Sequence, residues 1–297
     1  MRIDQIVSNS RPTISFEFFP PKSDDAADQL FDRVRAEFEP LRPSFVTVTY
    51  GAGGSTRERT RSLVLRLNRE TDVMTAPHLT CVGASCDELA GILQQYADAK
   101  IENIVALRGD APKNATEFTP AADGFAYANE LVEFIKREFP QFGVIVAGYP
   151  EGHPETPNKL DDLDNLKRKV DAGADVITTQ LFFDNRDFYD FAERCEIAGI
   201  RVPIVAGIMP IQSIKGITRM AGLSGARIPA PLLRALGRAG QDEEAVRKVG
   251  AHWATEQCRD LLDHKVAGIH LYTLNKSDAT RRIYESLGIA NTDALHA

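Results

Sequence analysis

The sequence has few of the features that mark specialised classes of protein. Its 297 residues include only four cysteines at irregular spacing, which argues against a disulfide framework and suits a reducing compartment. No apolar run approaches the roughly 20 residues that a bilayer-spanning helix needs, and residues 1–12 lack a signal-peptide core. The net charge of −7 is scattered, without the basic patch of a nucleic-acid-binding surface. We therefore expect a cytoplasmic protein without a membrane or nucleic-acid partner, and self-association stays open.

Several catalytic and metal-binding signatures are also missing. The chain has no GxSxG, HExxH, GKS/T phosphate loop or CxxC motif, which argues against common hydrolases, proteases, NTPases and dithiol enzymes. His78, Cys81 and Cys86 offer three soft ligands, but Cys86 falls inside a helix-capping sequence and no fourth ligand is near. We therefore expect no metal site.

What the sequence does contain is an alternation of short apolar runs with longer segments of helical periodicity. The expected strands are residues 13–19, 45–50, 76–81, 103–107, 144–149, 175–183, 203–208 and 268–274. Several are apolar on both faces, which is typical of parallel strands between two layers. Amphipathic helices lie between them, one of them opened by a capping box from Ser85 to Glu88.

Eight such units predict an α/β protein with a single (β/α)8 TIM barrel over residues 1–297. Helices over 212–223, 229–238 and 242–264 expand the connection between strands seven and eight, and the last helix covers 277–287. Residues 1–12 are expected to be an N-terminal extension and 290–297 a loose tail.

A doubly wound open sheet is the alternative fold. It is suggested by the glycine-rich segment 51–56 (GAGGST), which follows the second expected strand. A dinucleotide-binding fingerprint, however, reads GxGxxG and follows the first strand. The sequence therefore favours the barrel.

Polar residues recur where the expected strands end, which is where the active site of a barrel forms. Glu17 lies among three phenylalanines, and alternation places Ser15, Glu17 and Phe19 on one face of the strand. Burial by these neighbours is expected to raise the pKa of Glu17 and suit it to general acid catalysis, whereas the alternative is a structural, salt-bridged glutamate.

A second polar group lies in residues 161–169 (DDLDNLKRK), which open the helix after the fifth strand. Arg168 and Lys169 lie a turn or so from Asp162 and Asn165, so the four side chains share one side of the helix. A helix N-terminus with Arg and Lys suits a pyrophosphate, and Asp with Asn suits ribose or adenine. The alternative is a solvated, charged helix face.

Nine blocks that include these residues resemble bacterial 5,10-methylenetetrahydrofolate reductases, in order, from residue 13 to about 288. The blocks are 15–21 (SFEFFPP), 48–52 (VTYGA), 76–81 (APHLTC), 106–110 (ALRGD), 149–154 (YPEGHP), 166–174 (LKRKVDAGA), 179–184 (TQLFFD), 207–210 (GIMP) and 271–275 (LYTLN). The resemblance covers the catalytic barrel, and we expect no counterpart of the regulatory domain of eukaryotic enzymes.

The resemblance implies an enzyme with non-covalent FAD. NADH or NADPH would reduce the flavin, which would then reduce 5,10-methylenetetrahydrofolate to 5-methyltetrahydrofolate in a ping-pong scheme that serves one-carbon metabolism and methionine supply. Glu17 would be the general acid that opens the imidazolidine ring of the folate to a 5-iminium cation. Asp110 would stabilise that cation and tune hydride transfer.

The resemblance also implies roles for further residues. Substrate contacts would come from Glu17, Thr49, Asp110, Gln180 and Lys276. Positions that hold FAD in the family correspond to Thr49, Tyr50, Ala52, His78, Arg108, Gly109, Asp110, Ala128, Tyr149, His153, Asp162, Asn165, Arg168 and Lys169.

The segment after the seventh strand departs from the family pattern. Some relatives present a Gln and a Phe there, one turn apart, that touch folate and nicotinamide, whereas this chain has Gly216 and Met220. The electron donor is therefore open. One alternative is a flavin- and folate-binding barrel subunit of an electron-transfer complex, reduced by a protein donor. A Rossmann dehydrogenase without flavin is a third hypothesis, and a colourless purified protein would favour it.

Overall fold

Eight parallel strands close into a barrel in the computed structural model of the chain, with β1 to β8 in sequence order around it. The structure describes residues 1–297 except 11, 22, 51–56, 111–118 and 297. The strands are β1 Thr13–Phe18, β2 Phe45–Val48, β3 Thr75–Thr80, β4 Asn103–Leu107, β5 Gly143–Gly148, β6 Val176–Thr179, β7 Ile204–Ile208 and β8 Gly268–Tyr272. The barrel is confirmed, and the open sheet is excluded.

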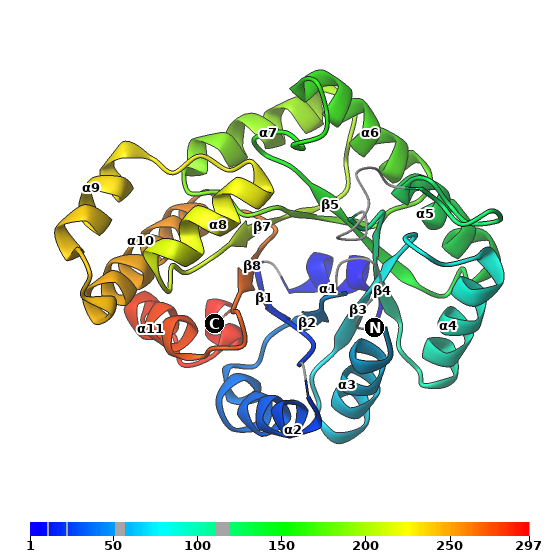
Figure 1. The fold of residues 1–297 in the computed structure, drawn as a ribbon, viewed down its shortest axis with the longest axis horizontal. Coiled ribbons are helices and arrows are strands. Elements are labelled where there is room, and N and C mark those ends of the chain that lie inside the picture. The colour runs from blue at the N-terminus through cyan, green and yellow to red at the C-terminus, as the bar shows by residue number, and fades with distance from the viewer. Residues whose placement is uncertain (11, 22, 51–56, 111–118, 297) are drawn as a thin grey trace.

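Helices surround the strands (Figure 1). They are α1 Ile3–Asn9, α2 Asp24–Arg33, α3 Arg57–Glu70, α4 Cys86–Asp98, α5 Ala128–Glu138, α6 Lys159–Asp171, α7 Asn185–Ile197, α8 Ile214–Ser224, α9 Ala230–Ala239, α10 Glu243–Asp263 and α11 Asp278–Leu287. The three extra helices between β7 and β8 lie where the sequence predicts them. No helix of the described residues is both long and apolar enough to span a membrane.

Local capping explains where two of these helices begin. At α4 the Ser85 hydroxyl accepts from the Glu88 amide at 3.2 Å, and the Glu88 carboxylate accepts from the Ser85 amide at 2.9 Å, so the predicted capping box forms. Helix α6 begins at Lys159, two residues before the segment that suggests it, because the Asn158 side chain caps the amides of Leu160 and Asp161. Such a cap satisfies backbone donors that have no partner within the helix.

The two faces of β1 point to different layers. The rings of Phe16 and Phe18 point outward and lie 5.4 and 4.9 Å from that of Phe38, in the layer between the strands and helices. Ser15 and Glu17 point inward, as alternation predicts, and Glu17 pairs in register with Thr47 of β2 and Tyr272 of β8.

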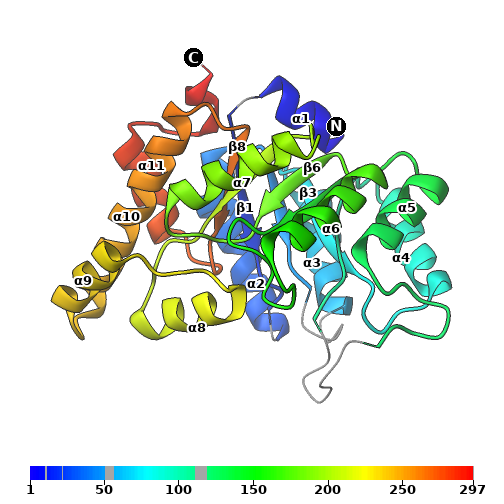
Figure 2. The same ribbon diagram turned by 90° about the horizontal axis from the view of Figure 1, so that it is seen from above.

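An apolar layer closes the end of the barrel at which the strands begin. It consists of Phe45, Ala76, Val105, Ile145, Val176 and Val205, packed against Ile3, Ile6 and Val7 of α1. The buried side chain of Asn103 holds α1 in place, because its oxygen accepts from the Ile3 amide at 2.6 Å and its nitrogen donates to the Met1 carbonyl. The expected N-terminal extension is thus a plug at the opposite end of the barrel from α8 (Figure 2).

The chain end packs on the barrel too. Residues Thr292–Leu295 form a 3-10 turn. The buried hydroxyl of Thr292 lies 2.9 Å from that of Tyr284 and donates to the Leu41 carbonyl, so this part of the expected loose tail is docked.

Candidate active site

A cavity of about 820 Å³ opens at the end of the barrel where the strands finish. Its wall includes residues from every strand except β7 and from α5, α6 and α8. Sites for small molecules and cofactors commonly measure about 300–1,000 Å³. Its size and its place in the fold therefore make this cavity the candidate active site.

The cavity gathers almost all of the predicted site residues. Its wall includes Glu17, Thr49, Tyr50, His78, Arg108, Gly109, Asp110, Ala128, Tyr149, His153, Asp162, Asn165, Arg168, Lys169 and Gln180. Ala52 lies outside the described residues. Lys276 is exposed beyond the end of β8 and is not part of the wall. Of the two positions that depart from the family pattern, Met220 lines the cavity and Gly216 does not.

Glu17 lies among polar side chains, not phenylalanines. Its Oε2 is 3.4 Å from Nε2 of His78 in β3 and 3.7 Å from Nε2 of His270 in β8. The Thr47 hydroxyl in β2 donates to the same oxygen at 3.5 Å. Only 7% of Glu17 is exposed, so its carboxyl is nearly buried. The side chains that surround it come from three strands that are distant from β1 in sequence or join it across the barrel closure.

These neighbours reverse the predicted pKa shift of Glu17. Burial alone would raise the pKa, but hydrogen bonds and positive charge from His270 and His78 outweigh it and lower the pKa to about 2. The predicted increase was wrong because Phe16 and Phe18 point to the other face and the histidines come from other strands. At this pKa the Glu17 carboxyl is ionised near neutral pH, so it must gain a proton before it can act as an acid.

Sequence reasoning missed several inward residues of this centre. The cavity wall also includes Thr47, Thr178 and His270, which lie outside the nine blocks, and Thr80 and Tyr272, which lie inside blocks but had no role assigned. The signal that could have found them is register. Once the barrel is assumed, alternate residues of each strand face its interior, and those nearest the strand ends face the cavity.

The far side of the cavity carries positive charge. Nζ of Lys169 donates to the Ala147 carbonyl at 2.6 Å, and burial lowers the pKa of Lys169 to about 8, although the nearby Asp162 carboxylate opposes the shift. Arg168 is exposed and pairs with Asp164, and Arg108 pairs with Glu155, each at 2.7 Å. This side of the cavity therefore has one partly buried cation, Lys169 of α6, and two better-solvated ones, Arg168 of α6 and Arg108 after β4, which suits an anionic group.

Two buried hydroxyls of the wall, Thr80 Oγ1 and Thr178 Oγ1, have no hydrogen-bond partner among the described residues. An unsatisfied buried polar group costs about 1–3 kcal/mol, so a bound molecule that supplies polar atoms here is favoured. The cavity volume, the cations and these hydroxyls all fit a large polar cofactor such as FAD. Among the described residues no group of His, Cys, Asp or Glu is arranged to hold a metal ion.

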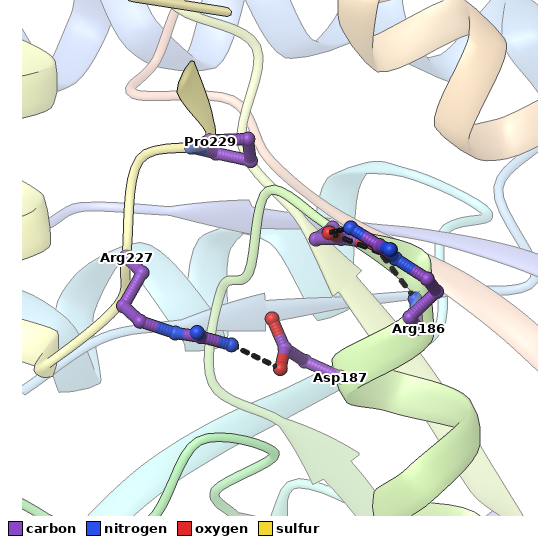
Figure 3. Close-up of a pocket in the computed structure, with 5 residues that line it drawn as sticks. Arg186, Asp187, Arg227 and Pro229 are labelled. Atoms are coloured by element: carbon purple, nitrogen blue, oxygen red, sulfur yellow. Dashed lines mark hydrogen bonds and ion pairs between the residues drawn. The ribbon is translucent and has the colours of Figure 1, made fainter. Parts of the chain in front are cut away.

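A smaller hollow of about 360 Å³ lies between α7 and the segment that joins α8 to α9 (Figure 3). The Arg227 guanidinium bonds to Glu151 at 2.8 Å and to Asp187 at 2.6 Å, and Arg186 pairs with Asp184. Because these charged side chains already pair with one another, we do not interpret the hollow as a binding site. The ion pairs of Arg227 with Glu151 and Asp187, which we call the rim clamp, hold the α8–α9 segment to the β5–α6 loop and α7.

Comparisons with known proteins agree with the geometry of the large cavity. A family model described as methylenetetrahydrofolate reductase matches residues 2–288. The 5,10-methylenetetrahydrofolate reductase of Escherichia coli is 40% identical over 276 residues, covering 93% of this chain and 90% of that protein. Methylenetetrahydrofolate reductase (NADH) 1 of Arabidopsis thaliana is 41% identical over 304 residues, covering 99% of this chain. The chain spans about half the length of this and other plant relatives.

Among solved structures, a protein from Clostridium thermocellum described as binding two copies of 5-methyl-5,6,7,8-tetrahydrofolic acid superposes with a TM-score of 0.63. The match covers 100% of this chain and 99% of the other, at 12% sequence identity. At that identity the similarity concerns the fold alone.

Proposed function

Because the chain belongs to the methylenetetrahydrofolate reductase family, we propose that it reduces 5,10-methylenetetrahydrofolate to 5-methyltetrahydrofolate, using bound FAD and electrons from NADH or NADPH. The observation that carries the proposal is one cavity that joins the Glu17 centre, Asp110 and Gln180 with the cationic start of α6. A proton donor for the folate and a site for a dinucleotide are both required for this reaction, and the cavity offers both.

The residues of the wall fit FAD by chemistry. Lys169, Arg168 and the first turns of α6 suit the pyrophosphate, while Asp162 and Asn165 suit the adenosine part. The flavin ring of FAD would then contact residues at the strand ends, which are Thr49, His78, Asp110 and the two threonines with unpaired hydroxyls, Thr80 and Thr178. When bound, FAD would carry the hydride, and the protein supplies position and electrostatics.

The protein's own groups have three tasks in this reaction. Glu17 holds a proton for N10 of the folate, so that the bond between N10 and the methylene carbon breaks and positive charge develops at N5. Asp110 places a negative charge at the mouth, where it stabilises that cation. Asp110 lines the cavity near Tyr149, where burial first and then the charge of Asp110 raise the pKa of Tyr149 to about 12.

A barrel subunit that receives electrons from a protein donor is the second candidate. It is favoured by one observation: α8 lines the cavity with Met220, where some relatives have residues that contact nicotinamide. Such a protein would bind FAD and folate without oxidising a nicotinamide itself.

Anaerobic stopped-flow absorbance at about 450 nm, where oxidised flavins absorb, tests both candidates. The purified protein, supplied with FAD if colourless, is mixed with NADH or NADPH and then with methylenetetrahydrofolate. Bleaching by a nicotinamide that the folate reverses would support the reductase and identify the donor. Chemically reduced flavin that the folate reoxidises, but that neither nicotinamide produces, would support the second candidate. Failure to bind FAD would contradict both.

A further inference from the structure

We propose that His270 is a positioning residue that shares one proton with Glu17 through Thr47, and that Ser15 sets its tautomer for this task. This inference rests on the proposed function, because the shared proton is the one that opens the folate ring. Its structural basis is an inward network of Ser15, Thr47 and His270, of which only Ser15 lies in one of the nine sequence blocks.

The His270 ring is held rigidly below Glu17. It is 1% exposed and stacks on the ring of Phe45, at 6.0 Å between centroids and 12° between planes. Tyr272 packs edge-on against its other side at 5.3 Å. Tyr272 is fixed in turn, because its hydroxyl donates to the Thr179 carbonyl at 2.6 Å and Gly207 leaves room for its ring. Packing therefore fixes the direction in which each His270 nitrogen points.

Hydrogen bonding assigns the protons of His270. The Ser15 hydroxyl lies 2.8 Å from Nδ1 and 3.3 Å from the Ile269 carbonyl oxygen, which only accepts. With its single proton directed to that carbonyl, the Ser15 oxygen accepts a hydrogen bond from the protonated Nδ1. Nδ1 is then protonated in both charge states of the ring, and Nε2 is the nitrogen that gains or loses a proton.

Nε2 faces the carboxyl that the reaction uses. It lies 3.3 Å from the Thr47 hydroxyl and 3.7 Å from Oε2 of Glu17. The Thr47 hydroxyl also donates to that Oε2 at 3.5 Å, so it bridges the two groups. A proton on Nε2 would reach Glu17 through Thr47 by two transfers over contacts of 3.3 and 3.5 Å, and contacts of this length commonly tighten when a substrate binds.

Few other titratable groups face Glu17. His78 approaches from β3 at 3.4 Å, but it also lines the cavity at a position that the family resemblance assigns to FAD. The hydroxyl of Tyr272 is engaged by Thr179, and burial followed by the charge of Glu17 raises its pKa, so it stays protonated. His270 is the partner set deepest below the carboxyl, where the ring is shielded from solvent.

The proton count balances over one turnover. Glu17 gives its proton to N10, the bond from N10 to the methylene carbon breaks, and its electron pair stays on N10. The N5 lone pair forms the iminium bond, which the hydride of the proposed reaction then reduces. Before the ring opens, the shared proton passes from Nε2 of His270 through Thr47 to Glu17, which leaves His270 neutral. After the product leaves, Nε2 takes up one proton from solvent that enters the emptied cavity, whose wall includes His270.

The two half-reactions of a His270→Gln variant provide the kinetic test. Glutamine fills similar space but does not titrate in this range, so we expect a roughly 10- to 100-fold slower folate half-reaction and an altered pH profile between about pH 6 and 9. Flavin reduction should stay within about twofold. His252→Gln, at an exposed position of α10, is the matched control and should change neither. An unchanged folate rate and pH profile in His270→Gln would overturn the proposal.

A second measurement keeps the inference testable without catalysis. Nitrogen-15 NMR of the histidine side chains in the FAD-loaded wild type reports the tautomer directly, and we expect neutral His270 to carry its proton on Nδ1. Ser15→Ala, which removes one oxygen, should mix the two tautomers and slow the folate half-reaction about threefold to tenfold. A proton on Nε2 in the wild type would refute the assignment even if folate reduction is observed. If folate is not reduced but the tautomer is as expected, the proposed function fails and the network stands.

Discussion

The two ends of the barrel interior use the same strands for different purposes. Within two residues, which is about 7 Å along a strand, the inward side chain changes from Phe45 to Thr47 in β2 and from Ala76 to His78 in β3. In β6 it changes from Val176 to Thr178. Alternation decides which side chains face inward, but the layer decides their environment: the lower layer packs against α1, with only Val105 and Ile145 also reaching the floor of the cavity, and the polar upper layer forms the cavity wall.

This contrast implies that the lower layer serves stability and the upper layer chemistry. A substitution in one layer should therefore leave the other property almost unchanged. Substitutions in each layer, and at the rim clamp outside both, test whether the separation holds.

The largest effect is expected in the upper layer. Glu17→Gln removes the proton that the ring opening needs but keeps the size of the side chain, so we expect about a thousandfold loss in the folate half-reaction. Flavin reduction by the nicotinamide should change by less than about twofold. Stopped-flow absorbance of both half-reactions measures this, and an equal loss in both would remove Glu17 from the role of general acid.

The largest effect on stability is expected in the lower layer. Ile3→Ala truncates a fully buried side chain of α1, and we expect the free energy of unfolding to fall by about 2–4 kcal/mol. Urea unfolding followed by circular dichroism measures it. Ile197→Ala, at a position that is 79% exposed, is the matched control and should cost less than about 0.5 kcal/mol. Wild-type stability in Ile3→Ala would show that α1 does not close the barrel.

The charge of Lys169 should affect the stability of the apoprotein and its affinity for FAD in opposite directions. Its pKa of about 8 in the fold lies below its ordinary value of 10.5, so the charged form is less favourable in the folded chain than in the unfolded one. The stability of the apoprotein should therefore rise as the pH increases from about 8 to 10.5, where the folded chain has lost this proton and the unfolded chain has not.

Lys169→Met removes this penalty, and at pH 7 we expect an apoprotein that is about 1–2 kcal/mol more stable. Its affinity for FAD should fall about 10- to 100-fold, because the buried cation is lost. Thermal unfolding across pH and fluorescence titration with FAD measure the two effects. Lys167→Met on the same helix is the control for affinity, and an equal loss there would mean that general charge, not the buried site, binds the cofactor.

The smallest effect is expected at the rim clamp. Arg227→Ala leaves the Glu151 carboxyl, whose side chain is 7% exposed, without its cation, and we expect a loss of about 1 kcal/mol at pH 7. Burial already raises the pKa of Glu151 and Arg227 opposes that shift, so the loss should diminish as the pH falls and Glu151 becomes protonated. Hydrogen exchange should quicken in residues 225–229. Arg186→Ala, whose guanidinium is mostly exposed, should leave this exchange unchanged.

Local pattern predicted much of the fold. Strand and helix positions follow from the period of the apolar residues, and the capping box of α4 forms from the two side chains that suggest it. The short helix α1 escaped prediction because three apolar residues in seven give little periodicity, and because its partners are at the starts of six strands.

The barrel, the end at which its candidate site lies and the family whose motifs line that site could all be predicted from the sequence. These properties depend on local periodicity and on residues at strand ends, both of which can be read along the chain. The charge state of Glu17 and the packing of α1 against the barrel follow only from the tertiary structure, and so does the tautomer that we propose for His270. Each of them depends on side chains that strand register brings within a few ångströms across the barrel, and electrostatic and packing energies depend on those distances, not on separation along the chain.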